Sequence, residues 1–247
     1  MHRHLTSAII TAVVVLTMVF AAAPGRAQQA TPQTAHPMKI GFIGSGNIGG
    51  AIGELLAKAG HEVFFSSRNP DNLKDLVSRV GPRARAGTAA EAIAFADVVF
   101  LGVPWSSMPD ISRDYAQALA GKIVLDAGNP RVSRDGPVAE PAVAKGAGVA
   151  TQEYLPKARI VRAFNQLNNK VFTSEAHRAG EKLAVPVASD DAQALAVVTQ
   201  LVIDAGFEPV NTGSLADSKA FDSSMPIFLK AMTAREMREA LKLPPAR

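Results

Sequence analysis

The chain has 247 residues, of which 47% are hydrophobic and 19% charged, with a formal net charge of +4. This length allows one or two domains with a sizeable core, and the composition is that of a globular chain rather than a disordered one. The chain has no cysteine, which excludes disulfides and thiolate metal sites. Few histidines and no run of basic residues lead us to expect no metal site and no nucleic-acid partner.

The first 27 residues have the order of a secretory signal, because Arg3 precedes an apolar stretch from 8 to 23 that ends in small residues. This stretch is short for a membrane span, which needs about 20 residues, so an uncleaved anchor is the less favoured alternative. Residues 28–37 are rich in Gln, Thr, Ala and Pro and are typical of a linker. We expect export to the periplasm, with membrane attachment only through an uncleaved leader. Translation from Met38 would instead give a cytoplasmic protein.

From Met38 onward, short apolar runs alternate with segments of helical periodicity. The expected strands are 39–43, 63–65, 97–102, 122–126, 159–163, 183–188 and 207–210. Helices are expected between them, and a helical stretch that Pro226 starts or kinks is expected to reach Leu243. This alternation predicts an α/β fold with a Rossmann-type doubly wound parallel sheet. We expect an NADP-binding domain over 38–157 and a smaller α/β portion over 158–247 for the acceptor side and for packing.

Residues 44–49 fit the G-x-G-x-x-G pattern, directly after a strand and at the start of a helix. They read Gly44, Ser45, Gly46, Asn47, Ile48 and Gly49. The first glycine permits a tight turn, the second lets a pyrophosphate approach the backbone, and the third lets the helix pack against the strand. Free N–H groups and the helix dipole then face the negative charge. The pattern predicts a dinucleotide site; the alternative is a strand-to-helix turn with tolerated glycines.

The end of the second strand indicates which dinucleotide binds. A binder of the ribose 2′-hydroxyl usually has Asp or Glu there, whereas this chain has Ser67 and Arg68, with no acid between Glu62 and Asp71. Ser67 can donate a hydrogen bond to a 2′-phosphate, and the Arg68 guanidinium can pair with it. We therefore expect NADP(H) as the cofactor. The alternative is a solvated loop arginine beside a capping serine.

From Met38 to about Ala234 the chain resembles the NADPH-dependent oxidoreductases of the deazaflavin type, which reduce or oxidise coenzyme F420. The matching pieces are 41–49, 66–68, 102–105, 161–165, 185–191, 205–210 and 213–215. The first three mark NADP-binding folds generally, and the later ones, in that order, are more specific. Membrane metalloreductases and pyrroline-carboxylate reductases look similar over the first half only. The chain departs from the family pattern at Asn72, where members can place Lys, and at Phe164, where a His can follow Ala163.

The resemblance implies that Ser45, Ser67 and Arg68 contact the adenosine phosphate. It also implies that a loop after the fourth strand borders the nicotinamide, namely Val103, Pro104 and Trp105. Loops that leave the carboxyl ends of parallel strands meet at one edge of the sheet.

We therefore expect Pro104, Trp105 and Asn165 around one crevice. Trp105 would be a flat wall for a planar acceptor, and Asn165 would hydrogen-bond a carboxamide or an acceptor carbonyl. A core position for Trp105 and a turn cap for Asn165 are the alternatives. Residues 227–232 are expected to form a packing face, and Asp190-Asp191 to cap a helix.

These features predict an oxidoreductase that transfers a hydride between NADPH and a small-molecule acceptor, which is coenzyme F420, a flavin or a similar ring. Such a transfer needs stacking and alignment more than a proton donor. An imine or carbonyl reductase related to pyrroline-carboxylate reductase is one alternative. A non-catalytic NADP-binding module is another. A homodimer is expected if the packing face lies between subunits.

Overall fold

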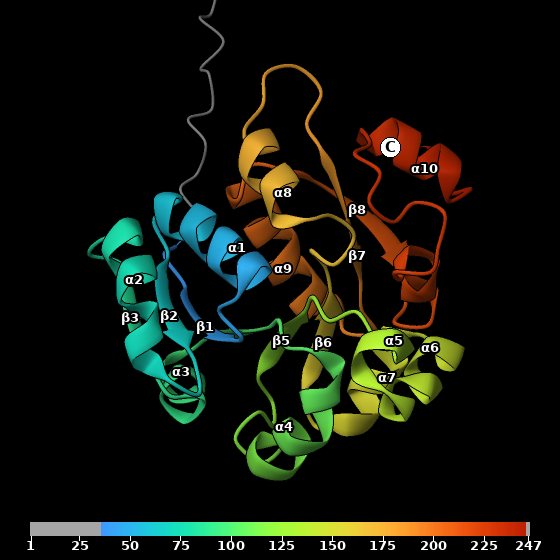
Figure 1. Cartoon of the computed structure of the whole chain (residues 1–247). Coiled ribbons are helices and arrows are strands. Elements are labelled where there is room, and N and C mark those ends of the chain that lie inside the picture. The colour runs from blue at the N-terminus through green and yellow to red at the C-terminus, as the bar shows by residue number, and fades with distance from the viewer. Residues whose placement is uncertain (1–35, 246–247) are drawn as a thin grey trace, which may run out of the picture. The chain divides into compact units, whose positions relative to one another are not determined.

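The computed structural model of the protein describes residues 36–245 (Figure 1). The expected signal at 1–27 and most of the linker lie outside this range. Within residues 36–245, no helix has both the length and the apolar character needed to cross a membrane. The described residues, 36–245, lie in one compact unit.

One sheet of eight strands, in the order β3-β2-β1-β4-β5-β6-β7-β8, forms the centre of this unit (Figure 1). The strands are β1 Lys39–Ile43, β2 Glu62–Ser66, β3 Ala84–Gly87, β4 Val98–Leu101, β5 Ile123–Asp126, β6 Arg159–Arg162, β7 Ala184–Ala188 and β8 Glu208–Gly213. Neighbouring strands are parallel except β6 and β7, which pair antiparallel at Arg162 and Ala188. The prediction of a Rossmann-type, doubly wound sheet is confirmed, and the pairing of β6 with β7 is the antiparallel exception within it.

Helices cover both faces of the sheet, each over its own core cluster. One face holds α1 Asn47–Lys58, α2 Lys74–Val80, α8 Asn169–Glu175 and α9 Ala192–Asp204. The other holds α3 Ala89–Phe95, α4 Met108–Tyr115, α6 Glu140–Lys145 and α7 Ala147–Tyr154. The short helix α5 spans Val132–Asp135, and α10 spans Ala234–Ala240 near the C-terminus. Short 3-10 helices lie at η1 Pro70–Leu73, η2 Trp105–Ser107, η3 Pro137–Ala139 and η4 Asp217–Phe221.

Local sequence signals explain where several helices begin. Thr88 and Glu91 form the capping box that starts α3. The Asp191 carboxylate accepts hydrogen bonds from the Gln193 and Ala194 N–H groups and caps α9, as expected. Phe42 of β1 stacks on Phe100 of β4 with ring centroids 5.0 Å apart, which packs the central strands into the core below α1.

The C-terminal stretch differs from the prediction. Only α10 is helical there, and the segment around Pro226 consists of turns. Leu229 has a φ of 62°, and its N–H donates to the Gln166 carbonyl at 2.7 Å. This bond holds the segment against the chain that follows β6. The expected division at 157/158 falls between α7 and β6, and β6 pairs with β5 in the same sheet.

Candidate functional site

The glycine loop after β1 has the shape that dinucleotide binding requires. Gly44 has a φ of 95°, and a Cβ there would lie 2.5 Å from the Gly102 carbonyl oxygen. A Cβ on Gly49 would clash with the Gly44 carbonyl, so this glycine allows α1 to approach β1. A Cβ on Gly46 would meet no atom within 4 Å. The second glycine therefore borders open space, at the place where a pyrophosphate would approach the backbone.

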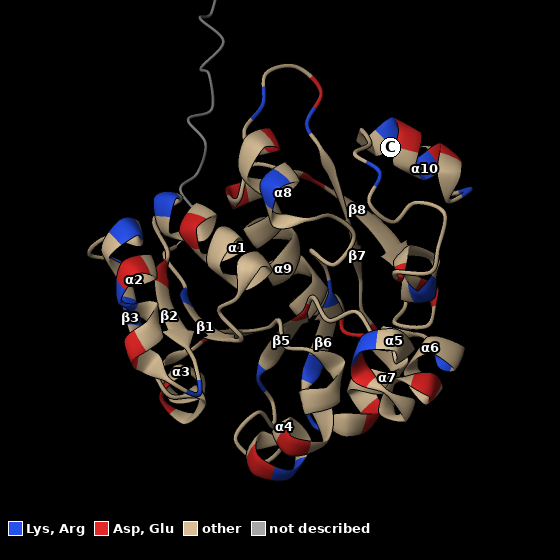
Figure 2. Cartoon of the chain, in the orientation of Figure 1, with Lys and Arg blue, Asp and Glu red and all other residues tan. Residues whose placement is uncertain are grey.

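The N-terminus of α1 is free to bind an anion. Gly46 is its N-cap and has no side-chain capping bond, and the first turn of a helix has N–H groups without intrahelical acceptors. No acidic residue lies in this first turn, and the start of α1 is free of charged residues in Figure 2. The unpaired donors and the positive end of the dipole favour a phosphate group. The loop thus fits the pyrophosphate of a dinucleotide.

The end of β2 lies beside this loop, because β2 pairs with β1. The Ser45 hydroxyl donates to the Ser66 carbonyl at 3.1 Å and ties the glycine loop to β2. The Ser67 hydroxyl accepts from the Asn69 N–H at 3.1 Å. Arg68 is exposed and has no ion-pair partner among residues 36–245. A free guanidinium beside a serine hydroxyl fits a ribose 2′-phosphate.

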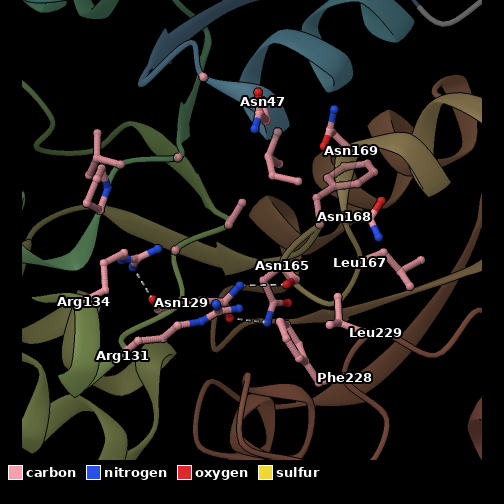
Figure 3. Close-up of a pocket in the computed structure, with 18 residues that line it drawn as sticks. Asn47, Asn129, Arg131, Arg134, Asn165, Leu167, Asn168, Asn169, Phe228 and Leu229 are labelled. Carbon is pink, nitrogen blue, oxygen red and sulfur yellow. Dashed lines mark hydrogen bonds between the residues drawn. The ribbon is translucent and has the colours of Figure 1, made fainter.

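A cavity of about 530 Å³ opens next to the glycine loop (Figure 3). Its volume is in the range of small-molecule sites. Its lining comes from the chain after β1, β4, β5 and β6, together with the turn before α10: residues 46–48, 102–104, 127–129, 131, 134, 164–165, 167–169 and 228–229. Val103, Pro104 and Asn165 are among these residues, so the structure brings the predicted nicotinamide loop and Asn165 to one pocket.

Trp105 does not lie on this pocket. Its side chain is 1% exposed and belongs to the core cluster on the α4 and α7 face. The ring packs edge-on against Tyr154 of α7, with centroids 6.2 Å apart. The turn at Trp105–Ser107 directs the side chain into the core, so the expectation of a flat acceptor wall at Trp105 is corrected. The core alternative describes its position.

Asn165 and Asn129 form a hydrogen-bonded pair in the lining of the pocket (Figure 3). Asn165 Nδ2 donates to the Phe221 carbonyl at 2.9 Å and to Asn129 Oδ1 at 3.2 Å. Asn129 Nδ2 returns a bond to the Asn165 carbonyl at 2.8 Å. The Oδ1 of Asn165 is buried and has no partner among the described residues. Phe164, with a φ of 57°, turns the chain so that Asn165 follows β6 into the pocket.

A buried charge cluster beneath the pocket fixes its walls. Arg162 is fully buried and lies 3.1 Å from the Asp126 carboxylate and 3.0 Å from that of Asp222. Arg162 also donates to the Gly128 carbonyl at 2.7 Å. Burial raises the pKa of Asp222, although the Arg162 charge acts in the opposite direction. The cluster joins the chain after β5, the end of β6 and the segment that leads to Phe228.

Sequence reasoning missed the residues on the far side of the pocket. Asn129, Arg131 and Arg134 follow β5, and Phe228 and Leu229 belong to the turn before α10. Phe228 was expected in a packing face, whereas its ring lines the cavity. The loop after β5 could have been included, because the strand was predicted and its carboxyl end lies beside that of β4. No sequence pattern marks the turn at 228–229.

The lining has little capacity for proton transfer. Arg131 and Arg134 are the only ionisable side chains among the lining residues. The lining has no Asp, Glu, His, Lys, Cys or Tyr. Arginine stays protonated in proteins, so it does not act as an acid or base at neutral pH. The pocket can therefore align and polarise bound molecules, and any proton must come from solvent or from the substrate.

Residues 39–130 match the family described as NADP oxidoreductase, coenzyme F420-dependent. The F420-dependent NADP reductase of Methanothermobacter marburgensis is 25% identical over 82% of this chain and 96% of its own length. Metalloreductase STEAP3 of Rattus norvegicus is 27% identical over 75% of this chain, which spans only 36% of that protein. The chain therefore spans only about a third of the length of these metalloreductases.

Several solved structures are similar to this chain. A putative F420-dependent NADP reductase from Arthrobacter superposes with a TM-score of 0.66 and 25% identity, covering 85% of this chain and all of the other. A hypothetical protein from Sinorhizobium meliloti gives 0.67 and 28%, covering 81% and 97%. An imine reductase from Myxococcus stipitatus gives 0.57 at 16% identity, covering 77% and 60%, and shows the fold alone.

Proposed function

We propose that this protein transfers a hydride between NADPH and a flavin-like acceptor, because residues 39–130 match the family of coenzyme F420-dependent NADP oxidoreductases. The class of acceptor favoured is a deazaflavin or a flavin. The observation that carries the proposal is the cavity beside the glycine loop, which has polar amides and apolar walls but no ordinary proton donor in its lining.

The residues present fit NADP(H) along the carboxyl edge of the sheet. The N–H groups at the start of α1 face the pyrophosphate, with open space at Gly46. Ser67 and Arg68 bind the 2′-phosphate at the end of β2. The chain after β4, Val103 and Pro104, borders the nicotinamide. When bound, the nicotinamide supplies or accepts the hydride.

The acceptor side combines apolar side chains with amide groups. Phe228 and Leu229 line the pocket on the side away from Asn47 (Figure 3). Asn129 and Asn165 fix each other through two hydrogen bonds, so this part of the pocket wall keeps one geometry. Packing of a planar ring against Phe228 would bring it into alignment, and alignment is the main requirement of hydride transfer.

The lining bears on the alternative of an imine or carbonyl reductase. Reduction of such groups delivers a hydride to carbon and a proton to nitrogen or oxygen, and the lining has no residue of suitable pKa to provide that proton. The lining therefore gives no support for acid-assisted reduction of an imine or carbonyl, whereas hydride transfer to a flavin-like ring mainly needs alignment. A non-catalytic NADP-binding module remains the outcome if no acceptor is reduced.

NADPH oxidation with several acceptors tests the proposal. The purified protein is mixed with NADPH and, in parallel, with a deazaflavin, a flavin and a cyclic imine, and the loss of NADPH absorbance is recorded in a single turnover. We expect stoichiometric oxidation with the deazaflavin or the flavin and none with the imine. Reduction of the imine alone would overturn the choice of acceptor.

We also propose that the leader directs export, on the order of residues 1–27. Mass spectrometry of the protein from its native cell tests this. A mature N-terminus near Gln28 in the periplasmic fraction supports export, whereas a chain that starts at Met38 in the cytoplasm contradicts it.

A further inference from the structure

The two arginines of the pocket differ in their pairing. Arg134 donates to both oxygens of Asp135, at 3.0 and 2.8 Å, and also to the Asn129 carbonyl at 2.7 Å. Hydrogen bonds from Arg134 and from backbone N–H groups outweigh burial and lower the pKa of Asp135, so the carboxylate is ionised at neutral pH. The charge of Arg134 is therefore neutralised by its neighbour.

Arg131 has no such carboxylate partner among residues 36–245. Its guanidinium lies over the Phe228 ring, 5.5 Å from the centroid. Its backbone N–H donates to Asp135 at 2.9 Å, which fixes the start of the side chain. Stacking on an aromatic face restricts a guanidinium while leaving its N–H edge free to bind an anion. The pocket thus has one cation without a carboxylate partner, and its stacking on Phe228 restricts its position.

This cation lies away from the nucleotide phosphates. Figure 3 places Arg131 and Phe228 on the side of the cavity opposite Asn47. The pyrophosphate position is at Gly46 and Asn47, and the 2′-phosphate position is at the end of β2, two strands from β4 in the sheet. Arg131 follows β5, on the other side of β4. A second anionic group, separate from those of the nucleotide, is the ligand that suits it.

We infer that the acceptor carries an anionic group, of the phosphate class, that pairs with Arg131 while its ring packs beside Phe228. The inference rests on the proposed function for the identity of the site as the acceptor pocket. It adds that the site distinguishes an acceptor with this anionic group from one that has the same ring without it. Arginine pairs with phosphate through two parallel hydrogen bonds, which gives both affinity and orientation.

Riboflavin and its phosphate ester FMN form a matched pair of probes, because they share one ring and differ in the phosphate. Their affinities for the full chain loaded with NADP⁺ are measured by flavin fluorescence, so that the result does not depend on turnover. We expect FMN to bind roughly ten- to a hundredfold more tightly than riboflavin, the range for a hydrogen-bonded charge pair. In Arg131→Ala this ratio should fall to about one.

Two further variants distinguish direct pairing with Arg131 from the general electrostatic effect of nearby positive charges. Arg131→Lys keeps the charge but loses the planar fork, and it should keep a reduced preference for FMN. Lys230→Ala removes an exposed cation beside Leu229 that does not line the pocket, and it should keep the full preference. Equal affinity for FMN and riboflavin in the unmutated protein would overturn the inference, as would an unchanged ratio in Arg131→Ala. A preference for FMN without any flavin reduction would support the anion site and contradict the proposed hydride transfer.

Discussion

Arg162 of β6 and Asp222 form a buried ion pair of 3.0 Å that connects the sheet to the segment leading to Phe228. Asp126 of β5 shares the same guanidinium at 3.1 Å. The two carboxylates belong to segments that line or lead to the pocket, so one buried cation holds both walls. The same ion pairs therefore contribute both to the stability of the fold and to the geometry of the site.

Replacing Arg162 with Met should strongly destabilise the protein, because two buried carboxylates lose their cation. Breaking a buried pair in this way typically costs about 3–5 kcal/mol. Arg159→Met is the control on the same strand, since Arg159 pairs with Asp191 at a partly exposed site, where ion pairs contribute much less to stability. Urea denaturation gives both free energies of unfolding. Equal losses in the two variants would show that the buried cluster has no special role.

Asp191 should contribute to acid sensitivity. Its hydrogen bonds from Arg159 and from the N-terminus of α9 hold its pKa well below the usual value. A carboxyl with a lowered pKa in the folded state stabilises the fold above about pH 4 and loses that contribution as the pH falls further. Asp191→Asn should therefore reduce the fall in unfolding free energy between neutral and strongly acidic pH. The measurement is urea denaturation across this range, and an unchanged slope would argue against the assignment.

Arg68→Ala should weaken NADPH and leave NADH nearly unaffected, because only NADPH carries the 2′-phosphate. The expected loss is about 1.5–3 kcal/mol, the range for a hydrogen bond to a charged group. Fluorescence titration with both nucleotides measures it. Lys74→Ala is the control, since Lys74 is an exposed neighbouring cation already paired with Asp71 at 2.9 Å. Equal losses for NADPH and NADH would refute the role of Arg68.

Phe228→Ala should slow hydride transfer to a planar acceptor while NADPH affinity stays within about threefold. The ring lines the acceptor side of the pocket, and a group that aligns reactants affects the rate more than ground-state binding. Trp105→Ala should behave differently, because that ring is buried in the core. We expect it to lower the free energy of unfolding by about 3–5 kcal/mol. Single-turnover kinetics and urea denaturation distinguish the two, and a normal rate in Phe228→Ala would remove this residue from the site.

The nucleotide half could be predicted because its signals are local. The strand before Gly44, the glycine spacing and the helix after it are contiguous in sequence, and the second strand places Arg68 by the rules of the fold. Trp105 could not be placed, because an aromatic residue after a strand is compatible with either the pocket or the core. The turn at Trp105–Ser107 decides the matter, and sequence periodicity does not reveal its direction.

The acceptor side could not be predicted because it depends on contacts between distant segments. Asn129 meets Asn165 across 36 positions, and Asp222 reaches Arg162 across 60. The turns around Pro226 bring Phe228 to the pocket, and neither these turns nor the antiparallel pairing of β6 and β7 follows from hydrophobic spacing. The rule that ligands bind at the carboxyl ends of strands predicts the position of the crevice, but it does not predict the wall that contains Phe228.

The most direct test of the account follows the hydride itself. NADPH deuterated at nicotinamide C4, in each of its two configurations, is incubated with the protein and a deazaflavin, whose hydride-accepting atom is a carbon. Mass spectrometry of the reduced acceptor then reports whether deuterium has moved. We predict that the product carries one deuterium from one configuration of NADPH and none from the other, as expected of two rings held in one alignment. Bound NADPH that passes no deuterium to the deazaflavin, and that is not oxidised in its presence, would contradict the account.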